Sequence, residues 1–158
     1  MNVLQMNVTG DDQAGWTWSV QLDGKDVFRT KPLVRDDLAE ALFSIQRDNS
    51  RENELFCSVP DDALLFILDG YFFGELNDVL RASAEEQTWA KHLVSPAVPT
   101  VVGSRMFLIG ARDATEDRLL ISDGGSQPGS RIAAGRFDEL LRSARARLEQ
   151  RSSESDEQ

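Results

Sequence analysis

The chain has 158 residues, of which 41% are hydrophobic, and it carries 27 acidic against 17 basic side chains, a formal net charge of −10. This length and apolar content predict one globular domain, residues 1–150, and exclude an intrinsically disordered chain, which has too few apolar residues to form a core. A strongly negative protein repels nucleic acid and anionic lipid, so we expect no nucleic acid and no membrane as a partner.

The first third of the chain has the pattern of antiparallel strands. Apolar and polar residues alternate over residues 4–8 and again over residues 16–22, which gives each predicted strand one apolar and one polar face. The Asp-Gly pair at residues 23–24 fits the tight turn of a hairpin. Trp16 and Trp18 fall on the apolar face, so we expect both to be core residues.

Between residues 34 and 45 the apolar residues recur every three or four positions, and charged residues occupy the opposite face. This spacing predicts an amphipathic helix. Residues 55–57 then have the composition of a short strand.

The apolar segment 63–73 has two interpretations. The residues before it, 58–61, offer a capping hydroxyl, a proline and an aspartate, which are typical of the first turn of a helix. The same segment also fits two strands joined by an Asp-Gly turn at residues 69–70. The start signals agree with one another and favour the helix, which we expect to be largely buried because it is apolar nearly all round. A further helix is predicted over residues 76–84.

The last part of the chain predicts a meander of strands and a final helix. Short apolar runs at 89–94, 106–109 and 118–122 are separated by polar, glycine and proline residues, and 123–130 has the composition of a turn. Gly135 precedes an amphipathic stretch that predicts a C-terminal helix. The fold class is therefore α+β: an antiparallel β-sheet, made of the N-terminal hairpin and the C-terminal meander, packed with three to four helices. We expect residues 151–158 to be a disordered tail.

The sequence predicts a soluble, cytoplasmic protein. Cys57 is the one cysteine, so no internal disulfide can form. The first residues lack the basic and apolar regions of a signal peptide, and the longest apolar run, residues 63–68, is much shorter than the about 20 residues that cross a bilayer.

No residue pattern predicts a catalytic or metal site. His92 is the one histidine, which excludes metal centres and catalytic pairs built on several histidines. A Cys57–His92 nucleophile pair is conceivable, but both residues lie in apolar runs, which favours a buried thiol and a buried imidazole. Asp61 and Asp62 lack the glycine and the alternating carboxylates of a calcium loop. We therefore expect no enzymatic activity, no metal and no cofactor.

Four short motifs follow one another in the second half of the chain: Trp-Ala-Lys-His-Leu-Val-Ser-Pro at 89–96, Met-Phe-Leu-Ile-Gly at 106–110, Arg-Leu-Leu-Ile at 118–121 and Gly-Arg-Phe-Asp at 135–138. Their order resembles the bacterial polymorphic-toxin immunity proteins of the immunity protein 42 family, which show a similar His-Leu-Val-Ser strand, Phe-Leu-Val strand, Arg-Leu-Ile strand and Gly-x-Phe before a closing helix. Residues 18–24 are similar to the aromatic strand and glycine turn of that family.

The resemblance implies an immunity protein in interbacterial competition, including competition by type VI secretion, that neutralises a cognate toxin by direct protein binding. It implies no catalysis and no cofactor. The chain departs from the family at Gly110-Ala111-Arg112, where members often have an acidic residue, so an interface that used this acid would differ here. The matched residues look like framework, and no toxin contact is carried over from them.

The negative charge is concentrated in one third of the chain. Residues 35–86 contain 13 acidic and 4 basic side chains, whereas residues 87–158 contain 10 of each. A concentrated negative face accelerates association with a basic partner, so we expect a cognate toxin with a basic active-site face. The predicted contacts are acids of this region, with one tyrosine as an aromatic anchor: Asp61, Asp62, Tyr71, Glu75, Asp78, Glu85 and Glu86.

Three alternatives stay open at this point. In the first alternative, the acidic region is a solvated surface that only aids solubility. In the second, the protein is an adaptor or chaperone for a secreted effector, which would also be acidic and non-enzymatic. The third alternative is a small enzyme that uses carboxylates such as Asp61 and Asp62. An immunity gene lies directly after a toxin gene and its deletion is lethal when the toxin is present, which separates an immunity protein from the adaptor or chaperone.

Overall fold

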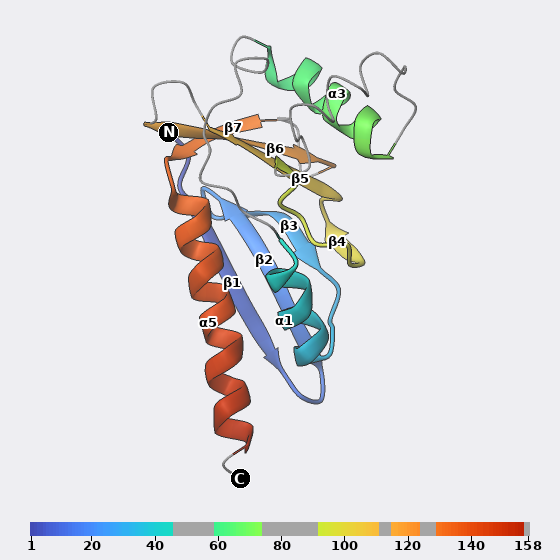
Figure 1. Cartoon of the computed structure of the whole chain (residues 1–158), viewed down its shortest axis with the longest axis vertical. Coiled ribbons are helices and arrows are strands. Elements are labelled where there is room, and N and C mark those ends of the chain that lie inside the picture. The colour runs from blue at the N-terminus through green and yellow to red at the C-terminus, as the bar shows by residue number, and fades with distance from the viewer. Residues whose placement is uncertain (46–58, 74–91, 111–114, 124–128, 157–158) are drawn as a thin grey trace.

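The computed structural model describes residues 1–45, 59–73, 92–110, 115–123 and 129–156. In this part of the chain, two antiparallel sheets and three helices form one mixed α+β domain with a helix at its C-terminal end (Figure 1). The predicted fold class is therefore confirmed. The strands divide between two sheets rather than one, with the orders β1-β2-β3-β4 and β5-β6-β7.

The first sheet is built mainly from the N-terminal third of the chain. Its strands are β1 (Leu4–Asp11), β2 (Gly15–Leu22), β3 (Lys25–Thr30) and β4 (Thr100–Val102). The turn between β2 and β3 has positive φ angles at both central residues, 53° at Asp23 and 84° at Gly24, as a type I′ hairpin requires. This confirms the hairpin predicted from the Asp-Gly pair.

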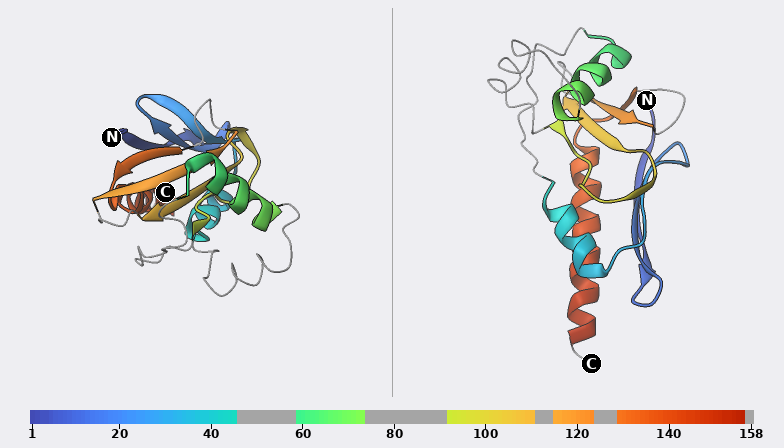
Figure 2. Two further views of the ribbon diagram at one scale, coloured as in Figure 1. Left: turned by 90° about the horizontal axis from the view of Figure 1, so that it is seen from above. Right: turned by 90° about the vertical axis from the view of Figure 1, so that its right-hand side faces the viewer.

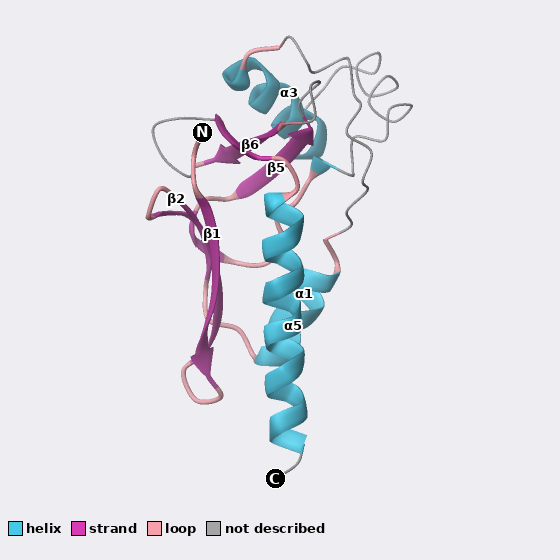
Figure 3. Ribbon diagram, turned by 90° about the vertical axis from the view of Figure 1, so that its left-hand side faces the viewer, coloured by secondary structure: helices cyan, strands magenta, loops and turns pink. Residues whose placement is uncertain are grey.

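Two helices cover one face of this sheet and enclose the main hydrophobic core (Figure 2). They are α1 (Arg35–Phe43), which confirms the helix predicted over residues 34–45, and α5 (Arg136–Asp156). Figure 3 shows the two helices side by side, opposite β1 and β2. The largest buried side chains of the sheet include both predicted tryptophans, Trp16 and Trp18, and Phe28.

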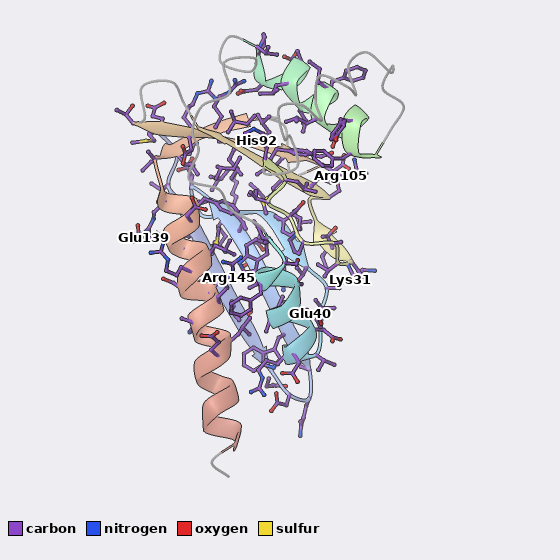
Figure 4. All side chains as sticks on the ribbon, in the orientation of Figure 1. Lys31, Glu40, His92, Arg105, Glu139 and Arg145 are labelled. Atoms are coloured by element: carbon purple, nitrogen blue, oxygen red, sulfur yellow. The ribbon has the colours of Figure 1, made fainter. Side chains whose placement is uncertain are left out.

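Arg145 of α5 binds the C-terminal end of α1 through hydrogen bonds. Its guanidinium donates two hydrogen bonds to the carbonyl oxygen of Leu42, at 3.0 and 2.7 Å, and one to that of Ile45, at 2.7 Å. The side chain lies between the two helices (Figure 4). The last carbonyls of a helix have no partner within the helix, and a cation is favoured at this negative end of its dipole. Burial lowers the pKa of Arg145, but a guanidinium stays charged in proteins.

The second sheet is buried on both faces. It consists of β5 (Arg105–Gly110), β6 (Glu116–Ser122) and β7 (Gly129–Ala133). Met106 and Leu108 of β5 join the main core, whereas the alternate residues Phe107 and Ile109 face a second hydrophobic cluster with α3. A strand with two buried faces needs apolar residues at successive positions, which explains the continuous apolar runs.

Helix α3 (Asp61–Phe73) packs on the outer face of the second sheet (Figure 1). This confirms the helical interpretation of residues 63–73. The expectation that the helix is largely buried is wrong for the described side chains: Leu64 and Leu68 are fully buried, but Phe66 is 79% exposed. The reason is that α3 is an outer layer, so only one of its faces contacts the sheet.

Other predicted elements differ from the structure where a strand pairs with residues that are far away in the sequence. Residues 129–133, of which the first two are predicted as turn, form β7. Residues Thr100–Val102 pair with β3 although no strand is predicted there. Of the predicted strand 89–94, the described residues make one isolated bridge, Leu93 to Phe107.

Helix α5 ends at Asp156, so it includes most of the residues for which a tail is predicted. The strand predicted at 55–57 and the helix predicted at 76–84 lie outside the described residues.

Candidate functional site

Asp61, the first predicted partner contact, is bound inside the molecule. Its Oδ1 accepts hydrogen bonds from Arg118 Nη2 at 2.6 Å and Nε at 3.0 Å, and from Arg131 Nη1 at 3.3 Å. Arg118 Nη2 also donates to the carbonyl oxygen of Val59 at 2.6 Å. The side chain of Arg118 is only 6% exposed and that of Asp61 is 25% exposed. This cluster joins the start of α3 to β6 and β7.

Burial by itself raises the pKa of Asp61, but the hydrogen bonds and positive charges of Arg118 and Arg131 outweigh it and hold the pKa below its usual value. The carboxylate is therefore ionised at neutral pH and is offset by two guanidinium groups. A charge that is neutralised within the molecule contributes little to steering a partner over long distances. The sequence did not predict this structural role, because the two arginines come from distant strands.

The other predicted contacts are dispersed or lie outside the described residues. Asp62 is exposed beside Asp61. Tyr71 is half-buried near the opposite end of α3, where its ring packs edge-on against Phe72 with 4.8 Å between centroids. The structure thus brings together Asp61 and Asp62 alone among the predicted contacts that it describes. The remaining predicted acids are outside the described part of the chain: Glu75, Asp78, Glu85 and Glu86.

His92 has a structural environment. The residue is 5% exposed, and its Nδ1 lies 3.0 Å from the carbonyl oxygen of Leu108. A carbonyl oxygen can only accept, so Nδ1 carries the proton in this hydrogen bond. The expected buried imidazole is confirmed. Cys57 lies outside the described residues, so the structure does not show how the two side chains are placed. Among the described residues, no group of three His, Cys, Asp or Glu side chains could hold a metal ion.

A pocket of about 480 Å³ opens between the β1–β2 turn and the start of α1. We call it the acidic pocket, because three carboxylates and one guanidinium line it, which leaves two negative charges in excess. Its lining residues are Asp11, Asp12, Gln13, Ala14, Gly15, Trp16, Pro32, Leu33, Val34, Arg35 and Asp36.

Local hydrogen bonds build the walls of the acidic pocket. Trp16 N donates to Leu33 O at 2.7 Å and Trp16 O accepts from Leu33 N at 2.9 Å, so the segment before α1 is fixed to β2. Asp11 Oδ1 accepts from the backbone N–H groups of Gln13, at 2.9 Å, and Ala14, at 2.6 Å, which closes the β1–β2 turn. Gly15 lies so close to Pro32 that a Cβ would meet its ring at 2.8 Å.

Neighbouring residues orient Asp12 in the acidic pocket but hold Asp36 only weakly. Asp12 Oδ1 accepts a hydrogen bond from Trp16 Nε1 at 3.3 Å. Arg35 Nε lies 3.9 Å from Asp36 Oδ1, which is a long ion pair, and the Asp36 side chain is 85% exposed. A pair at this distance and exposure is weak, so the carboxylate of Asp36 keeps most of its capacity to bind another cation.

The N-terminus of α1 also lines the acidic pocket. Val34 is the N-cap residue, and no side-chain hydrogen bond caps this end of the helix. The first backbone N–H groups of a helix have no intrahelical acceptor, and they favour an oxygen acceptor supplied from outside. The arrangement can therefore bind a positive group at its carboxylates and a carbonyl oxygen at the helix end.

Sequence reasoning missed the acidic pocket because its acids come from two segments. Asp11 and Asp12 lie in residues 1–34, where 4 acids and 3 bases almost balance, while Asp36 belongs to the acidic third. One feature of the sequence could have indicated the pocket: the acidic pair Asp11-Asp12 follows the first predicted strand, and a second acidic pair, Asp36-Asp37, lies at the start of a predicted helix.

The comparisons with known proteins give no relative: no family model, no curated protein and no solved structure matches the chain. The resemblance to the immunity protein 42 family therefore stays a prediction carried by its short motifs. No helix in the described part of the chain has the length and apolar character needed to cross a membrane.

Proposed function

We propose that this protein is an immunity protein that binds a cognate bacterial toxin and neutralises it by direct contact through an acidic surface. Such a protein acts in the cytoplasm of the cell that it protects, and it needs no catalysis and no cofactor. The proposal joins the motif resemblance of the sequence with the distribution of charge on the folded chain.

The observation that supports this function best is a group of exposed acids at one end of the molecule. We call this group the acidic end: Asp11, Asp12, Asp36, Asp37 and Glu40. Three of these residues line the acidic pocket, and the other two follow on α1. In contrast to Asp61, none of them is bound to an arginine closer than the 3.9 Å between Arg35 and Asp36, as far as the described residues show.

The acidic end carries more negative charge than is favourable for the stability of α1. Asp36 and Asp37 in the first turn of α1 favour the helix, because they face the positive end of its dipole. Glu40 is one turn further on and four residues after Asp36, and like charges at this spacing destabilise a helix by about 0.2–0.5 kcal/mol. A surface that tolerates such repulsion is well suited to attract a basic protein, since steering depends on charge that is not neutralised internally.

The first experiment tests partnership and protection together. The chain is co-expressed with the product of the gene directly upstream, and we measure co-purification and the growth of cells that produce this product. The proposed function predicts a stable complex and restored growth. Binding without protection would support the adaptor or chaperone alternative instead, and absence of both would contradict the proposal.

The second experiment tests the acidic surface. The triple reversal Asp12→Lys, Asp36→Lys and Glu40→Lys should slow association with the toxin by about tenfold or more at 0.01 M salt. The difference should shrink at physiological salt, because the Debye length falls from about 30 Å to about 8 Å. The single reversal Glu139→Lys, near the start of α5, is a control for charge placed elsewhere (Figure 4).

A separate quadruple reversal to lysine at Glu75, Asp78, Glu85 and Glu86 tests the predicted contacts outside the described residues. Association rates that respond to neither set of reversals, and that do not change with salt, would show that the acidic residues form a solvated surface without a binding role.

A further inference from the structure

We infer that the acidic pocket binds an arginine of a protein partner, with its guanidinium among the carboxylates and a neighbouring main-chain carbonyl at the N-terminus of α1. The inference deepens the proposed function and rests on it for the identity of the partner. The chemistry of the pocket itself is derived from the described residues alone.

The acidic pocket is large enough to hold a guanidinium group and part of its methylene stem. Its volume of about 480 Å³ lies within the about 300–1,000 Å³ that is usual for ligand pockets. Backbone hydrogen bonds between Trp16 and Leu33 hold two of its walls together, and the Asp11 side chain closes the turn above it. Walls that are ordered before binding reduce the conformational entropy that the protein loses when a ligand binds.

The charges of the acidic pocket select a cation. Asp11 and Asp36 offer exposed carboxylates, and Asp12 is held by the indole N–H of Trp16 while it stays exposed. Arg35 offsets one of these three charges at most. An incoming guanidinium could bind two carboxylates at once because its five N–H donors form a fixed fork, whereas an ammonium group acts as a point charge.

The lining of the acidic pocket also favours arginine over a small inorganic cation. Trp16, Pro32 and Leu33 contribute apolar atoms to its lining. The methylene stem of an arginine packs on such a surface, and guanidinium groups are favoured next to aromatic rings. Among the described residues, no group of acids could hold a metal ion, which agrees with this assignment.

The uncapped start of α1 distinguishes a peptide from a free cation. A cation alone gains nothing from the N–H groups at this helix end, whose partial positive charge repels it. A peptide that places its arginine side chain among the carboxylates can also place a carbonyl oxygen against these N–H groups. The two interactions together are available to a protein partner but not to a polyamine.

The test uses the full chain labelled with ¹⁵N and the peptide acetyl-Gly-Arg-Gly-amide as the probe. We expect saturable shifts of the Trp16 indole signal, assigned with Trp16→Phe, and of the backbone signals of Asp36 and Asp37. The n-butylguanidinium ion, which has the same single positive charge as the peptide but no carbonyl, should bind at least about threefold more weakly. Equal affinity for n-butylguanidinium would overturn the assignment of a protein partner in favour of a free cation.

Conservative variants keep the test independent of folding. Asp36→Asn, at a position that is 85% exposed, should lower the affinity for the peptide by about two- to fivefold. The double variant Asp12→Asn and Asp36→Asn should lower the affinity for the peptide by about tenfold. The asparagine at position 12 can still accept the hydrogen bond from the Trp16 indole. The matched control Glu139→Gln removes one charge far from the pocket and should leave the affinity unchanged (Figure 4).

Shifts that do not saturate, or that persist unchanged in the double variant, would overturn the inference. Its failure can be separated from failure of the proposed function. If the toxin co-purifies but the peptide does not bind, the acidic pocket is not the contact while the immunity function stands. If the peptide binds as described but no toxin is neutralised, the pocket assignment stands and the immunity function falls.

Discussion

Asp36 and Asp61 occupy the same place in their helices, the first turn, and each is followed by a second aspartate. Their surroundings are opposite. Asp61 binds Arg118 at 2.6 Å and is 25% exposed, whereas Asp36 is 85% exposed and lies 3.9 Å from Arg35. One carboxylate thus joins two layers of the fold, and the other is available to a partner. The comparison shows that the role of an acid at a helix start is decided by the residues that the fold brings to it.

The largest expected effect is the loss of the internal ion pair. Asp61→Ala leaves the buried guanidinium of Arg118 without its carboxylate, and breaking such a pair costs about 3–5 kcal/mol when it is fully buried. Because Asp61 is 25% exposed, we expect about 2–4 kcal/mol, measured by urea unfolding followed by circular dichroism.

Asp62→Ala is the matched control for this change. Asp62 is exposed, and its carboxylate accepts from the N–H of the next residue, so the loss should stay below about 0.5 kcal/mol. Equal losses in the two variants would contradict the structural role of Asp61.

A smaller effect is expected at Gly129 of β7, which touches the same carboxylate. A Cβ at this position would overlap the Asp61 side chain, so Gly129→Ala should displace the carboxylate from its arginines. We expect a loss of about 1–3 kcal/mol in unfolding free energy, as for other overpacked sites. The double variant with Asp61→Ala should lose less than the sum of the two single variants, because the overlap with the carboxyl group is then removed and only the close contact with Cβ of residue 61, at 2.8 Å, stays.

The pH dependence of stability should distinguish Asp61 from other acids. The pKa of Asp61 is lowered in the folded state from its ordinary value of 3.8, so the folded state favours the ionised form. Its contribution is present above pH 3.8 and is lost as the pH falls through the lower folded value. The difference in unfolding free energy between the wild type and Asp61→Asn should therefore shrink as pH falls below about 4. A constant difference would contradict the ion pair.

The smallest predicted effect concerns the open start of α1. Val34→Ser introduces a hydroxyl that can cap this helix end, at a residue whose φ of −58° and ψ of 142° suit an N-cap. We expect a gain of about 0.5–1 kcal/mol in unfolding free energy and weaker binding of the arginine peptide, since the new cap competes for the same N–H groups. A gain in stability without any change in peptide binding would remove the helix end from the proposed contact.

The local elements of this protein could be predicted from its sequence because they depend on residues a few positions apart. The alternation over residues 16–22 predicts β2, the Asp-Gly pair sets the turn that follows, and helical spacing predicts α1. For α3, the proline and acids before residue 63 correctly favoured a helix over a hairpin. Hydrogen bonds between near neighbours and side-chain periodicity are sufficient for each of these decisions.

Only the tertiary structure decided the roles of the acids. Asp61 is separated from Arg118 by 57 residues and from Arg131 by 70, so no local pattern indicates that its charge is neutralised. The acidic pocket likewise exists only because Trp16 pairs with Leu33 and brings the β1–β2 turn against the start of α1. Such contacts arise when sheets and helices bury their apolar faces together, and this packing places charged residues from distant segments next to one another.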